Sequence, residues 1–136
     1  MTSHKISDIE EIGPKLIIKL ARAGITDQHS LLSACATKKG REEISLKTGI
    51  KKEKLLKWVN TVDLYRVEGV DIESIELLEA VGVEALDELK KFHPMSLYEK
   101  MKKINSTKKI VLQIPSLEET KKLIEQASKM NTVVMN

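Results

Sequence analysis

Residues 9–25 read IEEIGPKLIIKLARAGI, and residues 67–83 read VEGVDIESIELLEAVGV. The two stretches align without a gap at a constant offset of 58, and apolar residues and glycines recur at the same places in both. This pattern predicts a tight hairpin whose flanking Ile or Val side chains enter a core, followed by a helix that stops at Gly24 or Gly82. An internal repeat of this kind indicates two copies of one structural unit.

The composition favours helix throughout the rest of the chain. Of the 136 residues, 41% are apolar and 32% are charged, and only 3% are aromatic. A sequence rich in Leu, Ile, Lys and Glu has high helix propensity and a low tendency to form strands. We therefore expect an all-α protein that folds unaided as one compact domain, or as two small subdomains that share a core.

Caps and apolar spacing place the further helices. Glycines and prolines mark most of the expected ends, and Ser116 with Glu119 forms a capping-box pattern. The tail at 131–136 is expected to fray. The expected helices cover residues 14–23, 27–32, 38–48, 52–65, 84–91, 96–105 and 116–130, with a further turn or two within 107–114.

The two hairpin stretches resemble the helix-hairpin-helix motif of DNA repair and recombination proteins. The whole chain, including the stretches at 48–50, 58–60 and 115–119, resembles an uncharacterised bacterial family of tandem helix-hairpin-helix-like proteins, classed as a domain of unknown function. This resemblance implies a tandem, SAM-like multi-helix domain with two pseudo-repeats and a DNA-binding role. The repeats would occupy residues 1–63 and 64–136 and together form one compact unit.

In such a motif, glycines let the backbone turn tightly, and the N–H groups at the following helix N-terminus face a phosphate. Both copies here depart from the motif. Glu11 stands where the first hairpin would have its leading glycine, and Asp71 stands where the second would have its trailing glycine. The first copy keeps Gly13 and offers Lys15 and Lys19. The second copy is surrounded by carboxylates, so we expect the first hairpin to be the one that meets DNA.

Charge is distributed unevenly along the chain. Residues 1–63 carry 12 Lys or Arg against 8 Asp or Glu, residues 64–89 carry 1 against 8, and residues 90–136 carry 10 against 4. This distribution is typical of a protein with separate basic and acidic faces.

Further lysines surround a helix–turn–helix-like segment around Gly49, and a second basic run occupies residues 100–109. Exposed lysines usually solvate a surface, but these could contact phosphates without reading bases. The predicted nucleic-acid-binding residues are Gly13, Lys15, Lys19, Lys38, Lys39, Arg41, Lys51 and Lys52.

No pattern predicts catalysis, a cofactor, a metal site or a small-molecule substrate. His4, His29 and His93 lack catalytic partners at a recognisable spacing, and the lone Cys35 has no identifiable base. The acidic residues of segment 71–79 fit a solvated helix face better than a metal site. No apolar run is long enough to span a membrane, and one cysteine fits a reducing compartment, so we expect a cytoplasmic protein.

Two functions remain open. The first is a non-catalytic module that binds the backbone of duplex DNA weakly and without sequence specificity, through the first hairpin and nearby lysines. The alternative is a protein-interaction module in which both hairpins are architectural and the acidic helix 71–79 docks a basic partner or a second copy of the chain. The two are separated by whether the basic residues gather on one face with Gly13.

Overall fold

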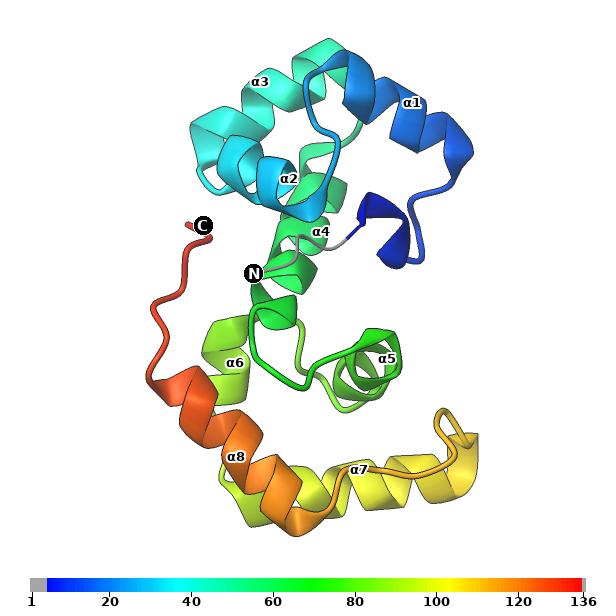
Figure 1. Ribbon diagram of the computed structural model, residues 1–136, viewed down its shortest axis with the longest axis vertical. Coiled ribbons are helices and arrows are strands. Elements are labelled where there is room, and N and C mark those ends of the chain that lie inside the picture. Colours follow the sequence, from blue (N-terminus) through cyan, green and yellow to red (C-terminus); the bar gives the residue numbers. More distant parts are fainter. Residues whose placement is uncertain (1–4, 136) are drawn as a thin grey trace. The chain divides into compact units, whose positions relative to one another are not determined.

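The computed structural model describes residues 5–135, which are helical with no strand (Figure 1). An isolated antiparallel bridge joins Lys5 to Asp27. The prediction of an all-α fold is confirmed. His4, considered above as a catalytic candidate, lies outside the described residues. No helix in the described range is long and apolar enough to cross a membrane. In chain order the elements are η1 (Ile6–Asp8), α1 (Pro14–Arg22), α2 (Gln28–Cys35), α3 (Lys38–Thr48), α4 (Lys52–Tyr65), α5 (Ile72–Ala80), α6 (Leu86–Lys91), α7 (Pro94–Lys108) and α8 (Leu117–Ser128).

The described chain divides into two compact units. The first comprises residues 5–63 and 133–135, and the second comprises residues 64–132. Each unit has its own hydrophobic core, so the expectation of a single shared core is replaced by two. The division falls inside α4, where Val62 belongs to the first core and Leu64 to the second.

In the first unit, side-chain caps fix where helices begin. Asp27 and Ser30 form a capping box at the start of α2, and the Thr37 side chain accepts a hydrogen bond from the Gly40 N–H at the start of α3. Helices α2 and α3 pack against each other. The core of this unit contains Ile6, Ile9, Ile12, Leu20, Ile25, Leu31, Cys35, Ile44, Ile50, Leu55, Trp58, Val59, Val62 and Val134.

The second unit has the same kind of construction. Asp71 caps α5, and Ser116 with Glu119 forms the predicted capping box at the start of α8. Helix α8 packs against α6 and α7, and α7 also packs against α5. The core contains Leu64, Tyr65, Val67, Val70, Ile75, Leu77, Leu78, Val83, Leu86, Leu89, Leu97, Met101, Leu123, Ile124 and Ala127.

The two aligned stretches adopt matching local structure. The bounds of α1 and of α5 correspond residue for residue at the offset of 58. After each helix a glycine takes a positive φ, 86° at Gly24 and 94° at Gly82, which is the left-handed conformation that favours glycine. The next residue then returns its N–H to the helix, from Ile25 to Leu20 at 2.9 Å and from Val83 to Leu78 at 2.8 Å.

Helix α7 differs from its prediction at both ends. It begins at Pro94 instead of residue 96, because a proline suits the first helical position and the His93 ring accepts the Met95 N–H at 3.3 Å. It continues to Lys108, and Lys109 then adopts a left-handed conformation with φ of 49°. The expected helical turn within 107–114 is therefore wrong after residue 108.

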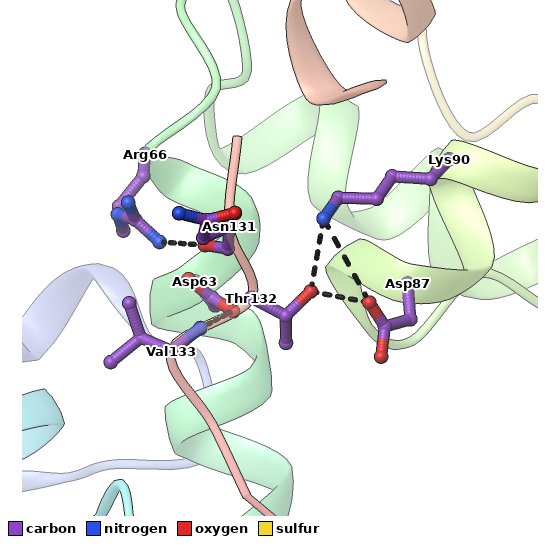
Figure 2. A network of polar contacts seen from close by, with 7 residues as sticks. All are labelled: Asp63, Arg66, Asp87, Lys90, Asn131, Thr132 and Val133. Carbon is purple, nitrogen blue, oxygen red and sulfur yellow. Dashed lines mark hydrogen bonds and ion pairs between the residues drawn. The ribbon is translucent and has the colours of Figure 1, made fainter. Parts of the chain in front are cut away.

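Residues 131–135 of the C-terminal tail are held by contacts instead of fraying as expected, and Asn136 lies outside the described residues. Val134 is 8% exposed and belongs to the first core, and the Met135 N–H donates to the Ala36 carbonyl at 2.8 Å. The Val133 N–H faces the buried Asp63 carboxylate at 3.3 Å (Figure 2). Residues 133–135 thus belong to the first unit, although their position in the sequence groups them with the second half.

The preceding two residues are held within the second unit. Thr132 donates a hydrogen bond to Asp87 of α6, and Lys90 of the same helix lies 3.3 Å from the Thr132 hydroxyl and 4.0 Å from the Asp87 carboxylate (Figure 2). Arg66 donates to the Asn131 carbonyl at 3.2 Å. These side chains fix the path of residues 131 and 132 after α8 ends.

Candidate nucleic-acid interface

The N-terminus of α1 has the features expected of an anion-binding helix end. Gly13 is its N-cap and provides no side-chain cap, and the first turn contains no acidic residue. Lys15 and Lys19 on α1 are both exposed. Lys15 lies in the first turn, so its ammonium group and the helix dipole favour an anion at this end, whereas Lys19 lies in the last turn, four residues further along the same side of the helix.

The fold itself does not require a glycine at position 13. Gly13 has an extended backbone with φ of −88°, which any residue can adopt, and a Cβ added there would meet nothing within 4 Å. Gly24 on the same segment differs, because its φ of 86° is strained for other residues. Gly13 therefore leaves open space beside the α1 N-terminus that intramolecular packing does not use.

Glu11, the departure in the first hairpin, is engaged by α4. Its carboxylate accepts hydrogen bonds from Lys57, with which it forms an ion pair, and from the Trp58 Nε1 at 3.2 Å. The hydrogen bond from Lys57 holds the pKa of Glu11 below its ordinary value, and Trp58 and the charge of Lys54 act in the same direction against desolvation. The carboxylate thus ties the hairpin to α4, and its charge is offset by a lysine.

Replacing Glu11 by glutamine is expected to make the free energy of unfolding of the first unit less sensitive to a fall in pH. Because the folded-state pKa lies below the ordinary 4.5, the carboxylate stabilises the fold above that pH and loses this contribution as the pH falls through the folded pKa. The ion pair is partly exposed, so screening limits the effect at pH 7 to less than about 1 kcal/mol. Urea unfolding of E11Q and of the unaltered chain at pH 7 and pH 3 measures the difference in their free energies of unfolding. The same difference at both pH values would contradict the prediction.

Two of the predicted basic residues, Lys38 and Lys39, lie away from the α1 N-terminus. Lys38 and Lys39 occupy the first turn of α3, and Figure 1 shows that turn and the first turn of α1 at opposite ends of the first unit. Lys51 immediately precedes α4 and Lys52 begins it, and both are exposed. On α1 itself, the predicted set contributes Lys15 in the first turn and Lys19 in the last.

Arg41 has a structural role that excludes it from the predicted binding set. Its side chain is 4% exposed. The guanidinium donates to the carbonyls of Cys35 and Ala36 at 2.9 and 3.0 Å and to the carbonyl of Met135 at 2.6 Å. It thereby caps the C-terminus of α2 and holds the tail, and no surface is left for a phosphate.

The second hairpin is packed and acidic, in contrast to the first. Asp71 caps α5 by accepting the Ser74 N–H at 2.8 Å, and Glu73 follows in the first turn. The Glu68 N–H donates to Gln126 of α8, so this part of the hairpin backbone is already used. A cavity of about 670 Å³ beside it is lined by Glu68, Gly69, Asp71, Glu73, Ser74, Leu77, Val111, Gln113, Ile114, Pro115, Glu119, Lys122, Leu123 and Gln126.

Helix α7 and the residue that follows α5 together form a hollow that the sequence pattern does not predict. Lys100, Lys103 and Lys108 of α7 surround a hollow whose floor includes Ile104 and Val81. Lys100 and Lys103 are three residues apart, a spacing that could have placed these two side chains near one helix face. The participation of Val81, which follows α5, could not be read from that spacing.

Comparison with known proteins gives a family. A family model described as Domain of unknown function (DUF4332) matches residues 10–130. The chain belongs to this family. The matched range of this DUF4332 chain includes nearly all of both hairpin stretches. No curated protein matches it, and no solved structure matches it.

Proposed function

We propose that this DUF4332 chain is a non-catalytic tandem helix-hairpin-helix module whose first hairpin binds the backbone of duplex DNA without sequence specificity. The observation that carries the proposal is the uncapped N-terminus of α1, with open space at Gly13 and exposed Lys15 and Lys19. The matching bounds of α1 and α5 support the tandem arrangement. The proposal leaves the second hairpin as a packing element.

Phosphate is the ligand that suits this end of α1. A phosphate oxygen accepts N–H hydrogen bonds at a helix N-terminus, and the dipole and the lysines stabilise its charge. Such contacts position a duplex but carry no base information. The few lysines near Gly13 imply weak binding whose affinity falls as salt is added, with roughly one unit of log–log slope for each phosphate contacted. Lys51 and Lys52 are proposed as additional contacts, whereas Lys38 and Lys39, at the opposite end of the unit (Figure 1), are not part of the proposed contact.

We propose no enzymatic activity for this chain, and we propose that it is located in the cytoplasm. Desolvation by burial raises the pKa of the Cys35 thiol to about 11, opposed in part by the charge of Arg41, so the thiol stays protonated at neutral pH. A protonated, buried thiol is a poor nucleophile. A single cysteine in the chain also fits a reducing compartment.

The loss of two lysines on α1 should weaken DNA binding in a defined way. In Lys15→Ala/Lys19→Ala, the slope of log K against log salt is expected to fall by about 2, because roughly one counterion is released for each phosphate contact. Fluorescence anisotropy of a labelled duplex across a salt series measures this slope. Lys38→Ala/Lys39→Ala removes the same charge at the other end of the unit and is the matched control. An equal loss in both variants would indicate diffuse attraction and would overturn the proposal.

A Gly13→Ala variant separates binding from folding. Because the added Cβ meets nothing within 4 Å, we expect the free energy of unfolding to change by less than about 1 kcal/mol, in the range of a cap substitution. The same methyl group would occupy the space proposed for a phosphate, so duplex affinity should fall about tenfold or more, the scale of losing one charge-assisted hydrogen bond. Unchanged affinity in a normally folded variant would count against a hairpin site.

A second function is proposed for the second unit, as a protein-interaction surface centred on the acidic helix α5. The specific observation is Ile72, the first residue of α5, which is 45% exposed between the exposed carboxylates of Asp71 and Glu73. Ile72 is not among the residues that form the core of its own unit or pack against it. It suits a partner that offers both an apolar contact and positive charge.

A further inference from the structure

An open hollow on α7 combines an apolar floor with a basic rim. Its volume is about 330 Å³. Val81 and Ile104 are half-buried, while the surrounding lysines are exposed. Apolar floors favour an apolar occupant, and the lysines favour a neighbouring negative charge. The residues that line the hollow are Val81, Lys100, Lys103, Ile104, Thr107 and Lys108.

The positive charge around this hollow is largely uncompensated. Within the described residues, no carboxylate forms an ion pair with Lys100, Lys103 or Lys108. A neighbouring hollow on α7 shares Lys100 and Lys103 and adds Lys102, with Glu99 as its one acidic residue. Lys100 lies 5.1 Å from the centre of the Phe92 ring, an arrangement that leaves its ammonium group available to an anion. The surface is thus basic over more than two turns of α7.

The start of α5 has the complementary chemistry. Ile72 is an exposed aliphatic side chain, and Asp71, Glu73 and Glu76 around it are exposed carboxylates. Residues 64–89 carry 8 acidic residues against a single arginine, whereas residues 90–136 carry 10 lysines against 4 acidic residues. One surface of the second unit therefore presents an apolar side chain among negative charges, and another presents an apolar hollow among positive charges.

We propose that the hollow on α7 receives Ile72 of a second copy of this chain, with Glu73 and Glu76 of that copy meeting Lys100 and Lys103. This inference rests on the second function above and identifies its partner. Duplex DNA would pair with the lysines but would leave Val81 and Ile104 uncovered and give Ile72 no role. The contact is small, so the association is weak, and its rim charges make it sensitive to salt.

Charge reversal on each side provides the test. Lys100→Glu/Lys103→Glu makes the hollow acidic, and Glu73→Lys/Glu76→Lys makes the α5 surface basic. Each variant alone places like charges opposite each other, so its self-association should fall at least about tenfold. An equimolar mixture of the two restores opposite charges at the contact and should associate again. Sedimentation velocity over a concentration series measures the mass, at salt from about 50 to about 500 mM.

Matched controls separate this contact from net charge. Lys38→Glu/Lys39→Glu and Glu42→Lys/Glu43→Lys change the charge by the same amounts on the exposed surface of α3 and should leave self-association unchanged. Ile72→Ser removes the apolar group without a charge change and should weaken association severalfold. All substituted positions are exposed, and circular dichroism checks that each variant is folded.

Several outcomes would overturn the inference. These are a wild-type chain that stays monomeric at low salt, a mixture that does not associate, or a Lys100→Glu/Lys103→Glu variant that loses duplex affinity while it still self-associates. A labelled peptide of alternating lysine and leucine tests the underlying function separately. If it binds the wild type and not Glu73→Lys/Glu76→Lys while no self-association occurs, the acidic surface retains its function and the second copy is excluded as its partner.

Discussion

Replacing Arg41 by alanine is expected to lower the free energy of unfolding of the first unit by about 3 kcal/mol, the scale of losing several hydrogen bonds from a buried charged group. The guanidinium makes hydrogen bonds to three carbonyls, two at the end of α2 and one at Met135. Alanine leaves those carbonyls without this donor and opens a gap where a 4% exposed side chain was packed.

Urea unfolding followed by tryptophan fluorescence measures the loss. Trp58 is the only tryptophan in the chain and is 1% exposed in the core of the first unit, so its emission reports that unit. Lys39→Ala removes an exposed positive charge from the same helix and should change the free energy by less than about 0.5 kcal/mol. If Arg41→Ala and Lys39→Ala unfolded at similar urea midpoints, the hydrogen bonds of Arg41 would not stabilise the first unit.

The contributions of the tail and of Arg41 to stability should be coupled. A chain that ends at Thr132 loses the buried Val134 and the Met135 carbonyl, and we expect it to be destabilised by about 2 kcal/mol, as for a buried aliphatic side chain. Combined with Arg41→Ala, the loss should be smaller than the sum of the two by about 1 kcal/mol, because the contact is removed in either case. Strict additivity would mean that the tail and Arg41 are not coupled.

Replacing Gly40 by alanine is expected to destabilise the first unit by about 2 to 3 kcal/mol, as overpacking does. Gly40 lies inside α3, and a Cβ there would stand 2.1 Å from the Ala34 carbonyl oxygen of α2. That oxygen belongs to the backbone and cannot turn aside, so α2 and α3 would have to separate. Helix propensity alone predicts the opposite sign, a gain of about 1 kcal/mol for alanine over glycine inside a helix.

The sign of this change distinguishes tertiary packing from local propensity. The same fluorescence-monitored urea unfolding measures it, with Gly13→Ala as the comparison, because a Cβ at Gly13 meets nothing within 4 Å. We expect a clear loss for Gly40→Ala and a small change for Gly13→Ala. Stabilisation by Gly40→Ala would mean that the two helices do not approach as closely as the structure has them.

Local patterns along the chain were sufficient to predict most of the helices. The Ser116–Glu119 capping box and the glycines after α1 and α5 involve residues within a few positions of each other, so their effects are visible in sequence. The all-helical class followed from the same local preferences. The N-terminus of α7 was misplaced because Pro94 can either break a helix or begin one, and only the neighbouring backbone decides which.

The candidate site was predicted in part. Gly13 and Lys15 are neighbours of the first residue of α1, so their position at the start of the helix could be inferred directly from the sequence, with Lys19 one turn further on. Arg41 reads as one more exposed cation in a basic run, yet it is buried because Cys35, Ala36 and Met135 present carbonyls to it. Met135 is 94 positions away from Arg41, and no local pattern encodes a contact over that separation.

The sequence by itself determined the helical class, the matching bounds of α1 and α5, and the separation of acidic from basic stretches. Periodicity, caps and charge act over a few residues, and they are written in residue order. Tertiary structure alone decided that the chain has two cores, that Glu11 is held by α4, that Gly40 must be small and that the tail returns to the first unit. Each of these depends on which distant groups pack together, and that is a property of the folded chain in three dimensions.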